Sequence, residues 1–262
     1  SEINYLRLMK NNQSERKKSS MPLRINRRSF LGVLSLIAQE LLESISTKLK
    51  LKKPKEEEVL INVRLKAEPN NPNSVLNIID NYAYKKTFLM NIGDEKGLLL
   101  ENAIKESQAN NILELGVYLG YSTIRILKNL NDNSKLTSIE SNKKFAEIAS
   151  ENIKIAGLSN NHELIIGKST EVIPSLKEKY DFIFIDHWKD LYLKDLKTLE
   201  ENDLIKNNAW IFADNVILFN LEDYLDYVRT SPNYKSKFIP AKREYSKSHP
   251  DGVEISIFKN EF

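Results

Sequence analysis

Hydrophobic positions between residues 74 and 258 alternate between runs of helical spacing and short continuous runs of strand length. Val75, Ile78, Ile79 and Tyr82 fall on one face of a predicted helix over Ser74–Lys86. A second helix is predicted from Asp94, as its N-cap, to about Ser107. Five apolar runs of strand length follow, namely Ile112–Leu115, Leu136–Ile139, Leu164–Ile166, Phe182–Ile185 and Trp210–Ala213.

Helical stretches are predicted between and after these runs, at about 122–130, 142–156, 170–179, 190–200 and 220–230. Gly157 would close the second of them as the residue after the C-cap. Strands that alternate with helices predict a parallel, doubly wound sheet. No helix separates Lys235–Ile239 from Val253–Phe258, so these two runs predict an antiparallel hairpin. The predicted fold class is α/β, with a mostly parallel seven-stranded sheet that ends in an antiparallel C-terminal hairpin.

The first 73 residues have a different character. Lys10–Arg28 is polar and basic, and the apolar run Phe30–Leu42 that follows is too short to cross a bilayer, which needs about 20 residues. The run could form a helix packed on the domain, or an interfacial helix whose basic flanks attract anionic lipid. Lys48–Glu58 is predicted to be a charged linker. We therefore expect an N-terminal arm and linker over 1–73, partly disordered or membrane-associated, and a catalytic domain over 74–262.

Composition narrows the function classes. The chain has 39 Lys and Arg against 36 Asp and Glu, and a net charge of +3 does not indicate a nucleic-acid partner. It contains no cysteine, which excludes disulfides and thiolate metal sites and fits a cytoplasmic setting. Its only histidines are His162, His187 and His249. A metal would therefore be held by oxygen ligands, as Mg²⁺, Ca²⁺ or Mn²⁺ are.

A glycine loop follows the first predicted strand and precedes a helix. Gly116 and Gly120 in this loop would let the backbone approach a ligand at the carboxyl edge of the sheet, although packing at a tight turn could also require them. The spacing differs from the G-x-G-x-x-G of dinucleotide enzymes, and no Walker lysine follows. Glu140 ends the second strand, 24 positions after Gly116, where an acid can accept both hydroxyls of a ribose. The alternative for Glu140 is a solvated acid at a strand end.

The fourth and fifth apolar runs also end in acidic residues. Asp186 follows one of them, and Asp214 with Asn215 follows the other. Two carboxylates and an amide oxygen suit Mg²⁺, which could bind both oxygens of a vicinal diol and lower the pKa of one of them. Lys189 lies three residues after Asp186 and could take the proton. Taken singly, the aspartates could instead be helix caps and Lys189 a surface lysine.

Four motifs give the chain a resemblance to a known family, and Ile185–Asp190, which reads Ile-Asp-His-Trp-Lys-Asp, is the most specific of them. The others are Met90–Asp94, Leu113–Gly116 with Gly120–Ser122, and Ala213–Ile217. From about Glu68 to Phe258 the chain resembles the catechol O-methyltransferase family. The resemblance implies a Rossmann-like class I methyltransferase that uses S-adenosylmethionine and Mg²⁺. It implies direct SN2 transfer of a methyl group to one hydroxyl of a catecholamine-like catechol, in a monomeric enzyme of catecholamine metabolism.

The resemblance also implies roles for individual residues. Asp186, Asp214 and Asn215 match the magnesium ligands, and Lys189 matches the general base. Glu244 matches the carboxylate that accepts the second catechol hydroxyl, and Phe88, Lys189, Asn215 and Glu244 match the substrate contacts. The implied cofactor contacts are Met90, Ile92, Glu114, Gly116, Tyr118, Ser122, Glu140, Ser169, Asp186, His187 and Trp188.

The departures from the family pattern concern mainly the aromatic substrate. Phe88 stands where the family usually has a tryptophan, Phe219 replaces a proline and Arg243 replaces a leucine, while Thr170 replaces a glutamine near the adenine. Another vicinal diol, such as a phenylpropanoid or a catechol steroid, is therefore an alternative substrate. A methyltransferase fold that now serves only as a binding partner is a second alternative. Retention of all five metal-side and substrate-side residues argues against it.

Overall fold

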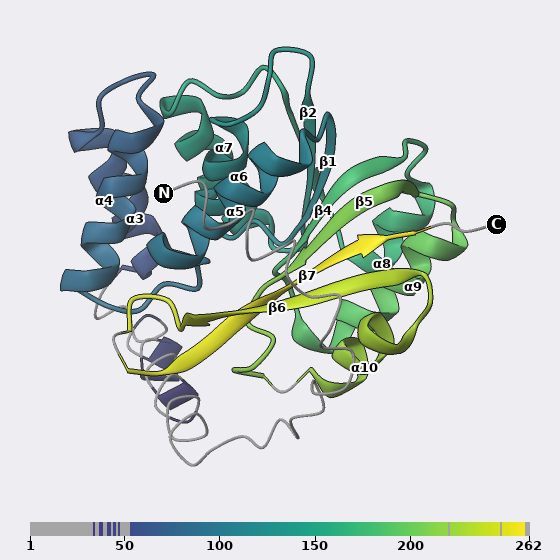
Figure 1. Ribbon diagram of the computed structural model, residues 1–262. Helices are drawn as coiled ribbons and strands as arrows, with labels where there is room; N and C mark the ends of the chain where they lie inside the picture. Colours follow the sequence, from purple (N-terminus) through teal and green to yellow (C-terminus); the bar gives the residue numbers. More distant parts are fainter. Residues whose placement is uncertain are drawn as a thin grey trace.

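A single seven-stranded sheet forms the centre of the molecule (Figure 1). The computed structural model describes residues 53–219, 221–246 and 248–259, with separate positions between 34 and 47. The strand order is β3-β2-β1-β4-β5-β7-β6. The parallel strands are β1 (Asn111–Leu115), β2 (Lys135–Glu140), β3 (His162–Ile166), β4 (Tyr180–Ile185) and β5 (Ile205–Ala213), and the antiparallel hairpin is β6 (Tyr234–Lys242) with β7 (Pro250–Phe258). The predicted fold class is confirmed.

Helices cover both faces of the sheet (Figure 1). One side carries α3 (Lys55–Lys66), α4 (Pro72–Lys85), α5 (Gly93–Ser107), α6 (Tyr121–Leu127) and α7 (Lys143–Ile155). The other side carries α8 (Ser169–Val172), α9 (Tyr192–Glu201) and α10 (Glu222–Thr230), with the 3-10 turns η1 (Ile173–Ser175) and η2 (Lys189–Leu191).

The strands divide their side chains between two hydrophobic cores. In β4, Phe182 and Phe184 belong to the core under α3–α7, whereas Ile183 and Ile185 belong to the core under α8–α10. Successive strand residues point to opposite faces, and all four side chains are fully buried. Each contributes about 1.5–3 kcal/mol of apolar transfer free energy. The continuous apolar run is thus explained by a strand that is buried on both faces.

Two predicted helices differ in detail from the structure. The helix expected over 170–179 is shorter, because Pro174 lies in the 3-10 turn η1 that follows α8 and has no backbone N–H to continue a helix. Asp94 is not an N-cap, since α5 begins at Gly93 with a φ of 76°. Asp94 lies inside the first turn, where the helix dipole favours its carboxylate, and it accepts a hydrogen bond from Tyr84.

The end of the predicted charged linker is helical. Its acidic trio, Glu56–Glu58, forms the first turn of α3, and Val59 and Val63 one turn apart are fully buried against α4 and α7. Lys55–Lys66, which precedes the predicted start of the catalytic domain, therefore packs on helices of that domain. The sequence concealed this helix because its apolar residues, Val59, Leu60, Ile61, Val63 and Leu65, are spread around the helix and do not form one face.

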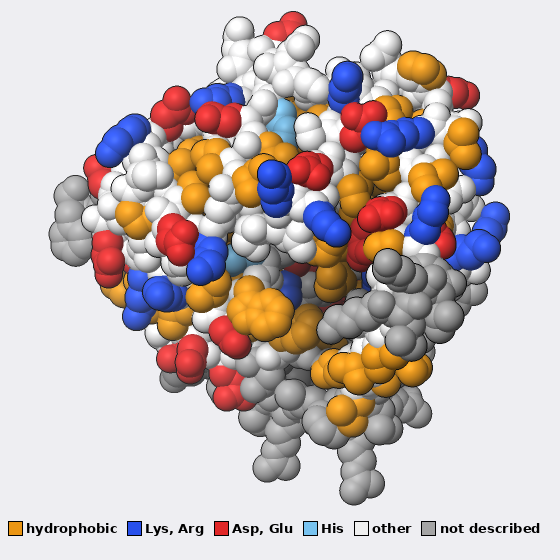
Figure 2. Space-filling view, turned by 180° about the vertical axis from the view of Figure 1, so that it is seen from behind, with side chains coloured by type: hydrophobic (Ala, Val, Ile, Leu, Met, Phe, Trp, Pro, Cys, Tyr) orange, Lys and Arg blue, Asp and Glu red, His pale blue; other side chains and the backbone are white. Residues whose placement is uncertain are grey.

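Part of the N-terminal arm is also described. The described residues between 34 and 47 are helical, and Leu34, Ile37, Leu41, Leu42 and Ile45 among them are between 45% and 67% exposed. The basic stretch Lys10–Arg28 lies outside the described residues. Within the part of the chain that the structure describes, no helix has both the length and the apolarity needed to cross a membrane. Elsewhere, acidic and basic side chains are interspersed over the face seen in Figure 2.

Candidate active site

The predicted site residues share one edge of the sheet. The last paired residues of β2, β1, β4 and β5 are in register, and the ladder continues by one hydrogen bond beyond them. Gly116 N donates to Ile139 O at 3.0 Å, Asp186 N to Leu115 O at 2.9 Å and Asp214 N to Ile185 O at 3.1 Å. Glu140, Gly116, Asp186 and Asp214 therefore form a row along the carboxyl edge, as predicted.

Each of the two glycines of the loop is required by a different local contact. Gly116 has a φ of 95°, and a Cβ at this position would lie 2.5 Å from the carbonyl oxygen of Asp186. Gly120 has a φ of 81° and would place a Cβ 3.3 Å from the backbone of Ala149. Residues that have a Cβ rarely adopt such backbone conformations. The close packing of Gly116 on Asp186 joins the glycine loop to the acidic end of β4.

Glu140 holds the glycine loop in place. Its Oε2 accepts hydrogen bonds from Val117 N at 3.1 Å and Tyr118 N at 3.0 Å, and its Oε1 accepts one from Asn142 N at 2.8 Å. Glu140 is only 8% exposed, so it is not the solvated strand-end acid of the alternative interpretation. A carboxylate has about four acceptor sites, so capacity remains for a further donor.

Glu114 lies beneath the loop in a buried polar cluster. It accepts hydrogen bonds from Ser122 Oγ at 2.6 Å, Thr123 Oγ1 at 2.7 Å and Ser138 Oγ at 2.6 Å. Burial raises the pKa of Glu114 to about 7, although these hydroxyls oppose the shift. Nearby, Tyr118 donates to Glu56 Oε1 of α3 at 2.8 Å. Of the remaining residues predicted on the methionine side, Ile92 is buried and Met90 is half-exposed.

The residues predicted around the adenine lie beyond the end of β4 and at the start of α8. His187 stacks on Tyr192 with the ring centroids 5.4 Å apart, and its Nε2 lies 2.7 Å from Asp195 Oδ2. Trp188 is 71% exposed, whereas Ser169, the first residue of α8, is buried. An exposed indole is available as a flat apolar surface for a ligand at this edge.

The metal-side residues lie where β4 and β5 end. Lys189 Nζ donates to Asp186 Oδ1 at 2.8 Å and to Tyr192 Oη at 2.7 Å. Asp214 is fully buried, and its Oδ1 accepts no well-directed hydrogen bond, although the Lys96 ammonium lies 2.8 Å from it. Burial raises the pKa of Asp214 well above its ordinary value, and neighbouring carboxylates add to the effect while Lys96 opposes it. The site thus carries an excess of negative charge.

The side-chain amide of Asn215 is oriented by two carboxylates. Its Nδ2 donates to Glu244 Oε1 and to Asp251 Oδ2, so the amide oxygen, Oδ1, is directed away from both. Asn215 has a φ of 56°, a left-handed conformation that asparagine tolerates better than most residues. The amide oxygen is therefore free for a cation or a hydroxyl group. Among the described residues, no three His, Cys, Asp or Glu side chains form a metal cluster of their own.

The predicted substrate wall combines aromatic and basic groups. The Arg243 guanidinium lies 5.7 Å from the centre of the Phe88 ring, and its buried Nε has no hydrogen-bond partner. Phe219 is 43% exposed, and the centre of its ring lies 5.6 Å from Lys189 Nζ. Three of the four positions that depart from the family pattern, Phe88, Phe219 and Arg243, thus lie on or next to residues of the predicted site.

Comparisons with known proteins agree with this site. A family model described as O-methyltransferase matches residues 68–222. Catechol O-methyltransferase B of Danio rerio is 36% identical over 234 residues, which cover 87% of this chain and 88% of that protein. Catechol O-methyltransferase of Mus musculus is 38% identical over 210 residues, 78% of this chain and 79% of that protein. The crystal structure of the O-methyltransferase TomG from Streptomyces achromogenes in complex with SAM has a TM-score of 0.63 at 20% identity, over 71% of this chain and 89% of that one.

These identities, over most of both chains, decide the family. The chain belongs to the catechol O-methyltransferase family. As a member of it, the protein is an S-adenosylmethionine-dependent methyltransferase with the class I fold. The glycine loop and the acidic row of this methyltransferase lie at the carboxyl edge of the sheet, the usual ligand site of open α/β sheets.

Two residues of this methyltransferase site, Lys96 and Asp251, were not predicted from the sequence. Lys96 Nζ lies within 3.0 Å of carboxylate oxygens of Asp214, Glu244 and Asp251, and all four side chains are buried. Lys96 shares the buried face of α5 with Leu100. A lysine on an otherwise apolar helical face was the available signal.

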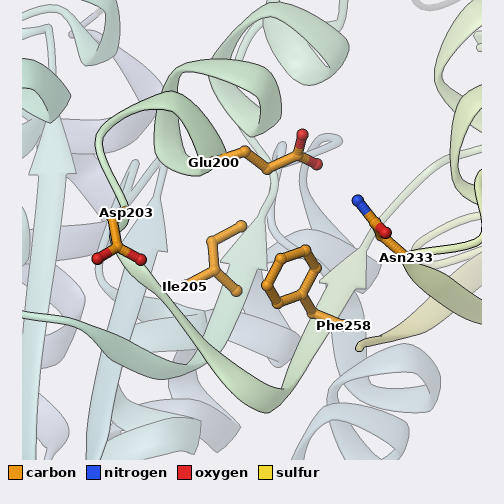
Figure 3. Close-up of a pocket in the computed structure, with 5 residues that line it drawn as sticks. All are labelled: Glu200, Asp203, Ile205, Asn233 and Phe258. Carbon is orange, nitrogen blue, oxygen red and sulfur yellow. The ribbon is translucent and has the colours of Figure 1, made fainter. Parts of the chain in front are cut away.

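Two cavities lie in different parts of the methyltransferase. A small one beside Lys96 and Glu244 is lined by the start of α5 and by the segment that follows β6. A larger one of about 200 Å³, shown in Figure 3, is lined by Glu200, Asp203, Ile205, Asn233 and Phe258. Ile205 begins β5, whereas the acidic row follows its end, so the larger cavity is at the opposite edge of the sheet. It does not belong to the candidate active site.

Proposed function

We propose that this chain transfers the methyl group of S-adenosylmethionine to one hydroxyl of a catechol, by direct SN2 displacement with Mg²⁺ bound at the end of β4 and β5. The observation that carries the proposal is the convergence of Asp186, Asp214, Asn215 and Glu244 beside the glycine loop. Adjacent oxygen ligands and an adjacent hydroxyl acceptor suit two neighbouring hydroxyls better than one.

The donor set fits a divalent cation. Asp214 is buried, and its only ammonium partner among the described residues is Lys96. Asn215 directs its amide oxygen away from its own carboxylate partners, and Asp186 uses one oxygen for Lys189. Hard oxygen ligands of this kind are the ones that Mg²⁺ takes. When bound, Mg²⁺ would lower the pKa of a substrate hydroxyl. The excess negative charge around Asp214 also favours a cation at this point.

Lys189 is the proposed general base and Glu244 the proposed acceptor of the second hydroxyl. Lys189 lies between the rings of Tyr192 and Phe219, with its Nζ beside Asp186, within reach of a hydroxyl held at the same carboxylate. Glu244 Oε1 already accepts two donors, which leaves its other oxygen for substrate. Glu140, His187 and Trp188 are proposed to hold the ribose and adenine, and the loop the methionine moiety. These residues act mainly by alignment.

The test is a methyl-transfer assay with a panel of catechols and matched monophenols, with Mg²⁺ and with a chelator. We expect turnover of catechols only, lost with the chelator and lost in Asp214→Asn. Turnover of monophenols at a similar rate, or turnover that survives the chelator, would contradict the metal mechanism. No transfer to any diol while S-adenosylmethionine still binds would favour a binding protein.

A second candidate substrate is a vicinal diol that carries a carboxylate, such as a phenylpropanoid acid. The half-buried Arg243 with its free Nε supports it. Arg243→Leu is expected to raise KM for an acidic catechol about tenfold or more, as loss of one charge-assisted hydrogen bond would, and to leave KM for a neutral catechol within about threefold. An equal rise of KM for the acidic and the neutral catechol would show that Arg243 does not recognise a substrate carboxylate. Steady-state kinetics with a matched pair of catechols measure the difference.

We further propose that the chain acts as a monomer, with peripheral membrane contact through its arm. The exposed leucines and isoleucines between 34 and 45 repeat at helical spacing, and basic residues lie on both sides of them in the sequence. Co-sedimentation with anionic and with neutral vesicles tests the contact. Failure to bind either kind of vesicle would contradict the proposed membrane contact.

A further inference from the structure

A buried lysine connects the two sides of the candidate site. The Lys96 ammonium has three hydrogens and three carboxylate partners: Glu244 Oε1 at 2.7 Å, Asp251 Oδ2 at 2.8 Å and Asp214 Oδ2 at 3.0 Å. The Lys96 side chain is 0% exposed, and so are those of Asp214 and Asp251. A buried ion cluster costs much desolvation free energy and is an inefficient way to stabilise a fold.

The three partners come from three separate elements. Asp214 follows β5, Glu244 follows β6 and Asp251 lies at the start of β7, while Lys96 itself is in the first turns of α5. The close approach depends on Gly93, where a Cβ would lie 3.2 Å from Glu244. The ammonium is thus the common contact that fixes the separation of these carboxylates.

We infer that Lys96 is a positioning residue for methyl transfer, which holds the substrate-side carboxylate Glu244 at a fixed place relative to the metal-side carboxylate Asp214. The inference rests on the proposed function. Asp251 is the third anchor, because its Oδ2 accepts hydrogen bonds from both Lys96 and Asn215 and its Oδ1 accepts one from Leu218 N. The hydrogen bonds of the Lys96 ammonium go to Asp214, Glu244 and Asp251, and not to the glycine loop or Lys189, so its effect should fall on substrate and metal rather than on the cofactor.

A cation beside Asp214 has two opposite consequences. It keeps Glu244 in place, and it also competes with a metal ion for the charge of Asp214, since its Nζ lies 2.8 Å from Asp214 Oδ1. Removal of the ammonium should therefore slow catalysis and at the same time strengthen divalent-cation binding. If Lys96 served only to stabilise the fold, its removal would weaken both catalysis and divalent-cation binding.

The test compares Lys96→Met with Lys105→Met, which removes an exposed lysine from the last turn of the same helix. Mn²⁺ affinity is measured by electron paramagnetic resonance without substrate, and S-adenosylmethionine affinity by calorimetry. We expect Lys96→Met to lower kcat/KM for a catechol at least fiftyfold, to bind Mn²⁺ at least threefold more tightly and to bind S-adenosylmethionine within threefold of the unmodified chain. Lys105→Met should change none of these.

Two further variants keep the inference testable if Lys96→Met folds poorly. Lys96→Met with Asp251→Asn removes one charge of each sign and is expected to restore the melting temperature while kcat/KM stays low. Lys96→Arg keeps the charge with a different shape and is expected to shift the ratio of the two monomethyl products, because Glu244 moves.

Three outcomes would overturn the inference: turnover of Lys96→Met within threefold of the unmodified chain, weaker Mn²⁺ binding in step with a lower melting temperature, or an unchanged product ratio in Lys96→Arg. Absence of methyl transfer by the unmodified chain would instead contradict the proposed function. The Mn²⁺ measurement would then still decide the role of Lys96 toward Asp214.

Discussion

Single side chains at the site are held by more than one partner, and this constrains what each can do. Lys189 donates to both Asp186 and Tyr192, and its ammonium also lies 4.9 Å from the centre of the Tyr192 ring. Such a lysine is oriented before substrate arrives, which a base for a single hydroxyl requires. Glu114 is oriented in the same way by three hydroxyls, but it is fully buried.

Lys189→Met is expected to lower kcat about a hundredfold or more, the usual contribution of a general base, and to leave S-adenosylmethionine affinity within about twofold. Quench-flow or steady-state methyl transfer measures the first quantity and calorimetry the second. Lys194→Met, which removes an exposed lysine from α9, is the matched control. A parallel fall of kcat and cofactor affinity would point to loss of structure instead.

Glu114→Gln is expected to change how stability depends on pH. Burial raises the pKa of Glu114 from 4.5 to about 7, so between these values the native state binds more protons than the unfolded state. Stability of the unmodified chain should therefore fall as pH rises through this window, by up to roughly 3 kcal/mol, and the Gln variant should lack this fall. Urea denaturation of both proteins from pH 5 to pH 8 measures the difference. Parallel curves would show that Glu114 is not protonated in the folded protein.

At the scale of elements, α3 packs on α4 and α7 and contacts the glycine loop. Val59 and Val63 anchor it to α4 and α7, and Glu56 in its first turn accepts the hydrogen bond from Tyr118. Through Tyr118, α3 is one contact away from Glu140. The helix therefore helps to hold the glycine loop, although the sequence predicted it to be part of the N-terminal arm and linker.

Val63→Ala is expected to destabilise the protein by about 1–3 kcal/mol, because it removes two buried methyl groups and leaves a cavity. Leu65→Ala on the same helix should cost less than about 0.5 kcal/mol, since Leu65 is 76% exposed. The free energy of unfolding in urea measures both. Similar small effects for the two variants would mean that α3 is not packed on the domain in solution.

At the scale of the whole molecule, the proposed cofactor site and the proposed metal site lie side by side at one edge of the sheet. Gly116 packs against the backbone of Asp186, so the glycine loop contacts the proposed metal side. The hydrogen bonds that the loop donates to Glu140 do not involve the side chains of Asp186 or Asp214. Cofactor binding should therefore persist without metal, even though turnover should not.

S-adenosylmethionine at about a hundred times its Kd is expected to stabilise the protein by about 2.7 kcal/mol, which raises the melting temperature by roughly 5–10 °C in a chain of this size. The shift should survive a chelator and should shrink in Glu140→Gln. Differential scanning fluorimetry measures it. A shift that vanishes with the chelator would mean that the cofactor needs the metal.

The sequence by itself determined the order of helices and strands, the two-sided burial of the sheet and the edge at which the site lies. Local spacing carries this information: Phe182–Ile185 reads as a buried strand, and Asp186 and Asp214 follow strands directly. The antiparallel hairpin followed in the same way from the absence of a helix between its strands. The assignment of Lys189 and Glu244 as functional residues came from resemblance, and their roles remain proposals.

Only the tertiary structure decided how distant segments share charge and packing. Lys96 and Asp251 are 155 positions apart and meet at 2.8 Å, and no local pattern can reveal a contact of that kind. The same holds for α3, whose apolar residues are spread around the helix, so that only the contacts with α4 and α7 identify Val59 and Val63 as the buried ones. Local periodicity records which face of an element is buried, whereas the partner on that face is fixed by the fold as a whole.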